Sequence, residues 1–197
     1  MRQAGIWPLS YALGTEGWWP KPSNNRGIIH TEQDQAETRK TLKLKSRWMD
    51  ELKNFTDGQA NYDLLNANNY LHTRYMQYAS SGLGAVRGFY GLRDHFLQPF
   101  FSAFTNRKLG IYQTRFAEGP IVTAAGWQSI KATHTGDFLG FSATNAPVEL
   151  RAMHWWRRAG EKIKENWVLF DLPHLFKQMD VDLFEQMLDQ QSKDSWL

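Results

Sequence analysis

The stretch 134–171 constrains the fold of this chain more than any other, because it predicts two long strands joined by a tight turn. Apolar and polar residues alternate through 148–157 and again through 162–170, which is the period of half-buried strands. The segment 158–161 reads Arg-Ala-Gly-Glu and predicts the hairpin turn between them. One face of this hairpin is mostly apolar, and we expect that face to be buried or to line a pocket.

His154 and Asn166 are the polar exceptions on the apolar face. With the turn centred on Ala159-Gly160, we expect His154 to lie opposite Asn166 and Trp156 opposite Lys164. A buried polar pair needs hydrogen-bond partners, either in the core or in a ligand. Histidine can also exchange a proton near neutral pH. The simpler alternative, a core histidine that only makes a structural hydrogen bond, stays open.

Two further residues of this stretch have both a structural and a chemical interpretation. His134 adjoins the turn at Gly136, which makes a structural hydrogen bond plausible for its ring. Asp171 directly precedes Leu172-Pro173, and this arrangement favours a helix N-cap over a catalytic acid. Both remain candidate catalytic residues.

The order of predicted elements indicates the fold class. Helices come first, and we expect them at 31–54, 61–71 and 88–104. Pro99 should kink the last of these helices. An extended segment at 73–79 lies between the second and the third. Strands follow at 110–116, 120–135, 148–157 and 162–170, and a helix at 172–179 precedes a polar tail. Helices followed by a meander of long strands are typical of an α+β fold.

Composition excludes several classes of function. The chain has no cysteine, which rules out disulfides, a thiolate nucleophile and cysteine-bound zinc. Its 23 basic and 20 acidic residues are interspersed and give a net charge of +3, so we expect no nucleic-acid partner. The apolar runs are shorter than the roughly 18 residues of a spanning helix, so we expect no membrane partner and a cytoplasmic location. The histidines lack metal-ligand spacing, and no metal is predicted.

Four segments together resemble a known family. Residues 132–145 read Ala-Thr-His-Thr-Gly-Asp-Phe-Leu-Gly-Phe-Ser-Ala-Thr-Asn, 148–157 read Val-Glu-Leu-Arg-Ala-Met-His-Trp-Trp-Arg, and 162–171 read Lys-Ile-Lys-Glu-Asn-Trp-Val-Leu-Phe-Asp. Residues 88–107 end in Ala-Phe-Thr-Asn-Arg, where Thr105-Asn106 stands for the family's Pro-Asp. Over about residues 40–185 the chain resembles the SnoaL-like polyketide cyclases, or ester cyclases, of the NTF2-like superfamily. The resemblance implies an α+β cone, in which a curved antiparallel sheet packs against N-terminal helices around a pocket.

The resemblance also implies a site. In characterised cyclases an Asp in the last strand, assisted by a His on the neighbouring strand, promotes aldol ring closure without metal or cofactor. His154 matches the family histidine and His134 another pocket histidine, but Val168 stands where the catalytic Asp belongs. Either His154 is the base here, or the chain does not catalyse the aldol step. The candidate catalytic residues are His154, His134 and Asp171, and the candidate substrate-binding residues are Asn166, Trp156, Val168, His95 and Tyr78.

The resemblance suggests three parts and a partner. We expect an irregular Trp- and Pro-rich arm or linker at 1–30, the SnoaL-like domain at 31–185 and a polar tail at 186–197. Residues 13–20, Leu-Gly-Thr-Glu-Gly-Trp-Trp-Pro, are similar to the linker of relatives with two tandem modules, so the chain is expected to correspond to a second module. Family members commonly dimerise through the sheet, and we expect a homodimer.

Two hypotheses about function follow. No nucleophile with an adjacent base is recognisable, so the first hypothesis is acid–base chemistry in an apolar pocket. The reaction would be a cyclisation, an isomerisation or a related reaction on a small apolar or aromatic ligand. His154 would be the base, and no cofactor would be needed. The other hypothesis is a non-catalytic module for ligand binding or assembly, which the missing Asp favours. A shifted His154 pKa beside an apolar pocket would favour the enzyme, and a cavity filled by Trp156 would favour the module.

Overall fold

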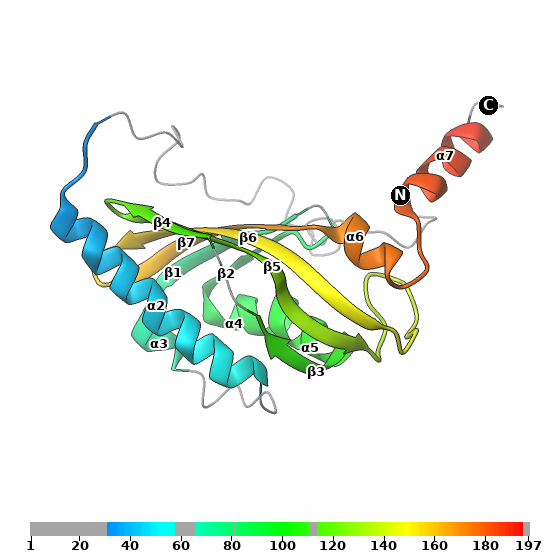
Figure 1. The fold of residues 1–197 in the computed structure, drawn as a ribbon, viewed down its shortest axis with the longest axis horizontal. Coiled ribbons are helices and arrows are strands. Elements are labelled where there is room, and N and C mark those ends of the chain that lie inside the picture. The colour runs from blue at the N-terminus through cyan, green and yellow to red at the C-terminus, as the bar shows by residue number, and fades with distance from the viewer. Residues whose placement is uncertain (1–30, 58–65, 81, 111–113, 195–197) are drawn as a thin grey trace.

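The computed structural model describes residues 31–57, 66–80, 82–110 and 114–194, and it places helices on one face of a seven-stranded sheet (Figure 1). The strand order is β2-β1-β7-β6-β5-β3, and β4 pairs with β5 beside β3. Neighbouring strands are antiparallel except β1 and β7, which are parallel. The predicted α+β cone is confirmed, whereas the predicted arm at 1–30 lies outside the described residues.

The elements follow the predicted order with shifted ends. The strands are β1 (Leu71–Tyr78), β2 (Ala85–Arg87), β3 (Phe104–Leu109), β4 (Thr114–Glu118), β5 (Ile121–His134), β6 (Pro147–Ala159) and β7 (Lys162–Phe170). The helices are α2 (Gln35–Asp57), α3 (Ala67–Tyr70), α4 (Gly88–Leu92), the π-helical turn η2 (Arg93–Leu97), α5 (Gln98–Ala103), α6 (Leu172–Lys177) and α7 (Leu183–Asp194). The first strand after the aromatic helix was predicted too late, because β3 already starts at Phe104.

A bulge in β5 bends the sheet around the helices. The register between β5 and β6 shifts between Gly126 and Ile130, so that β4 pairs with the first half of β5 and β3 with the second half. Ser129 compensates for the interrupted ladder: its hydroxyl donates to the Gly126 carbonyl at 2.8 Å and accepts from the Ala152 N–H at 3.0 Å. Bulges increase bending and twist, and Figure 1 shows β5 curving down toward α5. This curvature encloses the space between sheet and helices.

The hairpin of β6 and β7 has a different register from the predicted one. Trp156 pairs with Asn166 and His154 with Val168. One residue of this difference arises because Ala159 pairs with Lys162, which makes Gly160-Glu161 the turn, and a second arises from the register shift between Arg157 and Arg158. An extra residue in one strand moves all later pairs along the ladder. The predicted pairing of His154 with Asn166 is therefore wrong in register, but both side chains still lie on the same face of the sheet.

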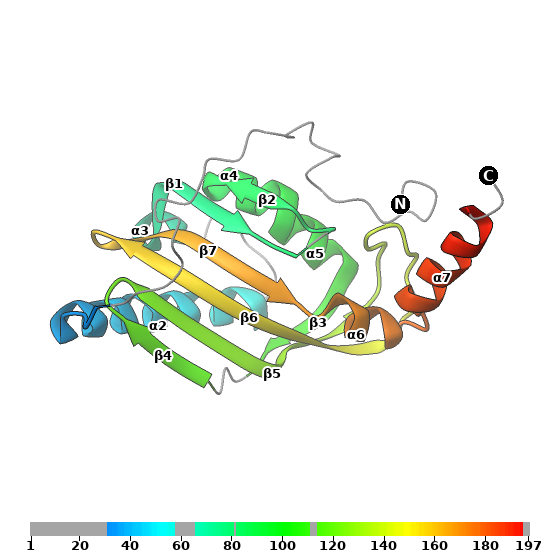
Figure 2. The same cartoon turned by 90° about the horizontal axis from the view of Figure 1, so that it is seen from above.

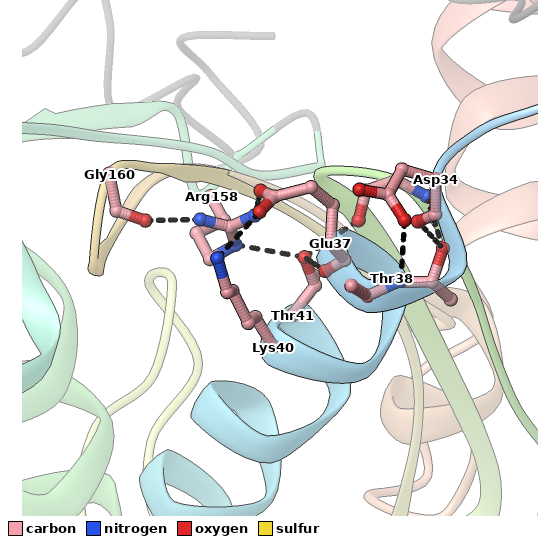
Figure 3. A network of polar contacts seen from close by, with 9 residues as sticks. Asp34, Glu37, Thr38, Lys40, Thr41, Arg158 and Gly160 are labelled. Carbon is pink, nitrogen blue, oxygen red and sulfur yellow. Dashed lines mark hydrogen bonds and ion pairs between the residues drawn. The ribbon is translucent and has the colours of Figure 1, made fainter.

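Helix α2 is fixed to the sheet by a polar network around Arg158 (Figure 3). The Arg158 guanidinium bonds to the Glu37 carboxylate and the Gly160 carbonyl, and its Nε donates to the Thr41 hydroxyl at 2.9 Å. Thr41 in turn donates to the Gly119 carbonyl at 2.7 Å, and the Gly119 N–H donates to the Thr38 hydroxyl at 2.9 Å. The network joins the first turns of α2 to the β4–β5 and β6–β7 turns and so fixes the helix that covers the sheet.

The aromatic helix predicted at 88–104 is an irregular helical segment that ends at Ala103. Its irregularity is the π-helical turn η2, which lies directly before Pro99 in the first turn of α5. Proline has no N–H for the helical ladder and crowds the carbonyl four residues earlier, so regular α-helix cannot continue through this point. The predicted four-residue spacing remains useful, because Leu92, Phe96 and Phe100 all face the enclosed space.

The C-terminal region contains a helix that the sequence analysis did not predict. We expected a polar tail after α6, but α7 runs through Leu183–Asp194 and projects away from the sheet in both views (Figures 1 and 2). Phe184, Met187 and Leu188 are exposed on it and are spaced three and four residues apart. This spacing places them on one side of a helix. In the sequence, the surrounding polar residues obscure this helical period.

Candidate functional site

A cavity lies between the sheet and the helices, with a volume of about 90 Å³. Helix α2 contributes Trp48, Met49 and Leu52 to its wall. The irregular helical segment contributes Leu92, Phe96, Leu97, Phe100 and Phe101, and the strands contribute Tyr75, Gln77, Leu109, Ile130, His154, Trp156, Asn166 and Phe170. The wall is therefore mostly apolar and aromatic, and its polar groups all come from β1, β6 and β7.

These polar groups form one hydrogen-bonded series, which we call the polar chain: Tyr75, Gln77, Asn166 and His154. The Tyr75 hydroxyl donates to Gln77 Oε1 at 3.1 Å, and Asn166 Nδ2 donates to the same oxygen at 3.0 Å. Asn166 Oδ1 lies 3.3 Å from His154 Nδ1. Since Asn166 presents its oxygen to the ring, Nδ1 of neutral His154 donates and Nε2 holds the lone pair.

The surroundings of His154 keep its ring neutral. Its pKa is lowered to about 4, chiefly by burial. The hydrogen bond that Nδ1 donates to Asn166 opposes this lowering, and the Lys45 ammonium adds to it. The ring also stacks on Trp156 with a centroid distance of 4.7 Å and an interplanar angle of 1°. Burial likewise raises the pKa of the Tyr75 hydroxyl, so this end of the polar chain is a neutral donor.

Lys45 is a buried cation next to this site that the sequence analysis missed. It lies on α2, is 2% exposed, and places Nζ 5.7 Å from the centroid of the Trp156 ring. Burial and, to a smaller extent, the Arg115 charge lower its pKa to about 8, and the attraction of Asp50 opposes this lowering. A positive charge behind the Trp156 ring disfavours protonation of His154 and favours negative charge in the cavity.

His134 does not line the cavity. It is fully buried in β5, where Nδ1 lies 3.1 Å from the Thr144 hydroxyl and accepts from the Thr144 N–H at 3.3 Å. Its ring packs on Phe104 at 5.2 Å between centroids, and burial lowers its pKa. The expected structural hydrogen bond is confirmed, with Thr144 as the partner, and a catalytic role for His134 stays a prediction.

Asp171 is the N-cap of α6, as predicted. Its Oδ1 accepts from the His174 N–H at 3.1 Å, and Oδ2 lies 3.5 Å from Arg151 Nη1. It is not among the residues that line the cavity. The structure supplies no acidic side chain to the cavity wall from the described part of the chain.

Three predicted substrate-binding residues also lie outside the cavity wall. Val168 is buried and pairs with His154 in the ladder, so an apolar side chain stands where the resemblance places an Asp. His95 is exposed on η2. Tyr78 stacks on Trp167 at 5.9 Å between centroids. Of the predicted residues, the structure brings His154, Asn166 and Trp156 together.

Gln77 and Tyr75 were overlooked although the sequence contained the signal. In 73–79 two alternating sets of residues occupy opposite faces of a strand, and Tyr75 and Gln77 belong to one set while Tyr78 belongs to the other. The prediction named Tyr78, but Tyr75 and Gln77 line the cavity. No sequence pattern identifies Lys45, because nothing in a helical period distinguishes a buried lysine from an exposed one.

Two further findings concern ligands and surroundings. In the described ranges, no group of three or more histidine or acidic side chains is arranged to hold a metal ion. No helix in the part of the chain that the structure describes is long and apolar enough to cross a membrane.

The fold and the cavity between the sheet and the helices define an NTF2-like cone, and comparisons with known proteins agree. The family model of the SnoaL-like polyketide cyclases matches residues 47–179, and the chain belongs to this family. No curated protein matches the chain.

Solved structures share the fold at low sequence identity. A protein of Jannaschia sp. CCS1, provisionally named a SnoaL-like polyketide cyclase, has a TM-score of 0.62 and 15% identity over 76% of this chain and 97% of its own. IdmH of Streptomyces antibioticus, provisionally named a polyketide cyclase, has a TM-score of 0.55 and 17% identity over 69% of this chain and 98% of its own. AclR of Streptomyces galilaeus, provisionally named a hydroxylase, has a TM-score of 0.57 and 17% identity over 73% of this chain and 97% of its own. Since cyclase and hydroxylase names occur on one fold, the activity must be argued from the site.

Proposed function

We propose that the protein performs cofactor-independent acid–base chemistry of the cyclase or isomerase type on a small apolar or aromatic molecule in the cavity, with His154 as the base. One observation carries this proposal: His154 lines the cavity and its Nδ1 is held by Asn166. That hydrogen bond fixes the tautomer in which Nε2 accepts a proton. Trp156 stacks on the ring and holds its orientation.

The lowered pKa sets a condition on the substrate. A base with a pKa of about 4 is always unprotonated at neutral pH, but it is a weak base. His154 therefore suits a substrate whose proton is already acidic, such as one on a carbon next to a carbonyl group. Lys45 assists from behind Trp156, because its charge stabilises an anion formed in the cavity.

A non-catalytic ligand-binding module is the second candidate, and two observations favour it. Val168 removes the carboxylate that the family mechanism uses, and no acidic side chain of the described residues lines the cavity in its place. The cavity of about 90 Å³ is also smaller than the ~300–1,000 Å³ of typical ligand pockets. Binding of a small molecule without turnover is the outcome that would establish this candidate.

We further propose a homodimer that forms through the outer face of the sheet, the face opposite α2 and α5. Figure 2 looks down on this face, and no helix of the described residues covers it there. Phe116, Trp127 and Leu169 on β4, β5 and β7 are all more than half exposed. Apolar side chains gathered on one sheet face are typical of an interface.

Deuterium exchange tests the catalytic proposal. Small ketones in D₂O are incubated with the wild type, with His154→Ala and with the control His95→Ala, which changes an exposed histidine outside the cavity. We expect faster exchange at the carbon next to the carbonyl with the wild type and His95→Ala, and background exchange with His154→Ala. Equal exchange with all three proteins would refute His154 as the base.

A further inference from the structure

Gln77 has a buried hydrogen-bond donor that nothing in the described protein satisfies. The residue is 4% exposed and lines the cavity. Its Oε1 accepts from both Tyr75 and Asn166, whereas its Nε2 has no hydrogen-bond partner among the described residues. The large majority of buried side-chain donors in folded proteins have a partner, because an unpaired donor costs free energy. A donor left unpaired at a cavity wall indicates a ligand atom as its partner.

The polar chain fixes which end of the Gln77 amide faces that ligand. Two donors, the Tyr75 hydroxyl and Asn166 Nδ2, meet at Oε1, so the nitrogen is the end without a partner. Reversing both amides would leave the buried Tyr75 proton without an acceptor in the described part of the chain. The orientation with Nε2 as the unpaired group therefore satisfies the larger number of buried polar atoms.

His154 supplies the complementary group on the same wall. Asn166 links Gln77 to His154, because its Nδ2 donates to Gln77 Oε1 and its Oδ1 accepts from His154 Nδ1. This orientation of the Asn166 amide leaves Gln77 Nε2 as a donor and makes His154 Nε2 an acceptor. The site thus offers one donor and one acceptor within an apolar enclosure. A ligand that matches it needs an acceptor oxygen close to an acidic hydrogen, and a carbonyl group with a hydrogen on the adjacent carbon has both.

We propose that Gln77 binds the carbonyl oxygen of the ligand through Nε2 and acts as the oxyanion donor opposite His154. This inference rests on the proposed function and names the residue that would stabilise its intermediate. In the step, His154 Nε2 takes the proton from the carbon next to the carbonyl. The electrons of that C–H bond form a C=C bond, and the C=O π electrons move to the oxygen, where Gln77 N–H donates. Return of the proton to the carbon restores neutral His154. Alternatively, the carbon attacks a second carbonyl carbon of the same molecule, the π electrons of that C=O move to its oxygen, and His154 gives its proton to this oxygen.

Matched probes separate the carbonyl contact from cavity filling. A cavity of about 90 Å³ is smaller than the ~150 Å³ cavity that holds benzene, so probes smaller than benzene are needed. Acetone and 2-methylpropene have the same shape and four heavy atoms each, but only the ketone accepts a hydrogen bond. The affinity of each probe is first corrected for its partitioning from water into an apolar solvent. After this correction, we expect the wild type to bind the ketone about tenfold more tightly than the hydrocarbon.

Two variants test the role of Gln77. At a pH high enough to ionise the new carboxyl group, Gln77→Glu keeps an oxygen that accepts from Tyr75 and Asn166 but replaces the donor with a second acceptor. Gln77→Met removes both groups. We expect each variant to lose the preference for the ketone and to retain the hydrocarbon, whose binding reports an intact cavity. Met49→Leu, a change of similar size in the apolar wall, should keep the preference.

A measurement on the wild type alone guards against misfolded variants. In the NMR spectrum of ¹⁵N-labelled protein, the Gln77 side-chain NH₂ signal should move on addition of acetone and stay in place with 2-methylpropene. A signal that does not move with the ketone, a preference that survives in both variants, or no binding of either probe would each overturn the inference. Ketone binding that depends on Gln77 without deuterium exchange would support the inference and refute the catalytic proposal.

Discussion

His154 and Asn166 are joined by a hydrogen bond of 3.3 Å between Nδ1 and Oδ1, although neither is the other's direct partner in the hairpin. They are diagonal neighbours on one sheet face, a separation that larger side chains can bridge. Because Asn166 is also bonded to Gln77, it determines both the tautomer of His154 and the orientation of the Gln77 amide. An amide, with its two distinct ends, can perform this double role, whereas a carboxylate has acceptors only.

Replacing Asn166 with aspartate should raise the pKa of His154. A carboxylate at 3.3 Å from Nδ1 favours the charged ring, so we expect the titration midpoint of Asn166→Asp to lie more than one pH unit above that of the wild type. NMR titration of the His154 ring protons measures this. Asn166→Leu, which has no charge, is the control and should show no such rise. An unchanged midpoint in Asn166→Asp would mean that the two groups do not interact.

Stability should depend on pH through His154. Its pKa is lowered from 6.5 to about 4 on folding, so between these values the unfolded chain binds a proton that the folded chain does not. The free energy of unfolding therefore falls as the pH falls through this window, by at most about 3 kcal/mol, and it is unaffected by this group above it. Urea denaturation of the wild type and His154→Gln at several pH values measures the difference.

The variant should lose less stability than the wild type between pH 6.5 and 4. Comparison with His95→Gln corrects for the removal of an exposed histidine. If the stability curves of the wild type and His154→Gln ran parallel through this window, the lowered pKa would be wrong.

Thr41→Val should destabilise the junction of α2 with the sheet. The hydroxyl of this buried residue accepts from Arg158 and donates to the Gly119 carbonyl, and valine leaves both groups unpaired. We expect a loss of about 1–3 kcal/mol in the free energy of unfolding, measured by urea denaturation. Thr41→Ser retains the hydroxyl and should lose less. If Thr41→Val and Thr41→Ser had the same free energy of unfolding, the hydrogen bonds of the Thr41 hydroxyl would not stabilise this junction.

Leu169→Lys tests the proposed dimer. The side chain is 58% exposed on the outer face of the sheet, so a charge there should not disturb the core but should disfavour an apolar interface. We expect size-exclusion chromatography with light scattering to give a dimer for the wild type and a monomer for the variant. Leu188→Lys changes a similarly exposed leucine on α7, away from the sheet, and should remain dimeric. A wild type that is monomeric at micromolar concentration would refute the dimer.

The sequence predicted the fold class and most elements because their periods are local. Alternation in 148–157 and 162–170 and the aromatic spacing in 88–104 each report burial of one face. The hairpin register was not predictable, since the shift between Arg157 and Arg158 depends on pairing and not on alternation. Helix α7 was missed because its four apolar residues, Leu183, Phe184, Met187 and Leu188, stand among polar ones.

The candidate site was predicted in its centre and missed at its edges. His154, Asn166 and Trp156 share a face of one hairpin, so strand geometry alone places them together. Gln77 comes from β1, which pairs with β7 in parallel over a sequence separation of 89 residues. Lys45 comes from a helix packed across the sheet. Contacts of this kind depend on the packing of distant elements, and no local period reports them.

The most direct test of the account is the ionisation and tautomer of His154, measured by ¹⁵N-detected NMR of the histidine rings in the wild-type protein. The account predicts a neutral ring at pH 7 with its proton on Nδ1, and a titration midpoint near 4. The signal is assigned by its absence in His154→Gln. A midpoint near the ordinary value of 6.5, or a proton on Nε2, would contradict a buried base that Asn166 holds ready at the cavity wall.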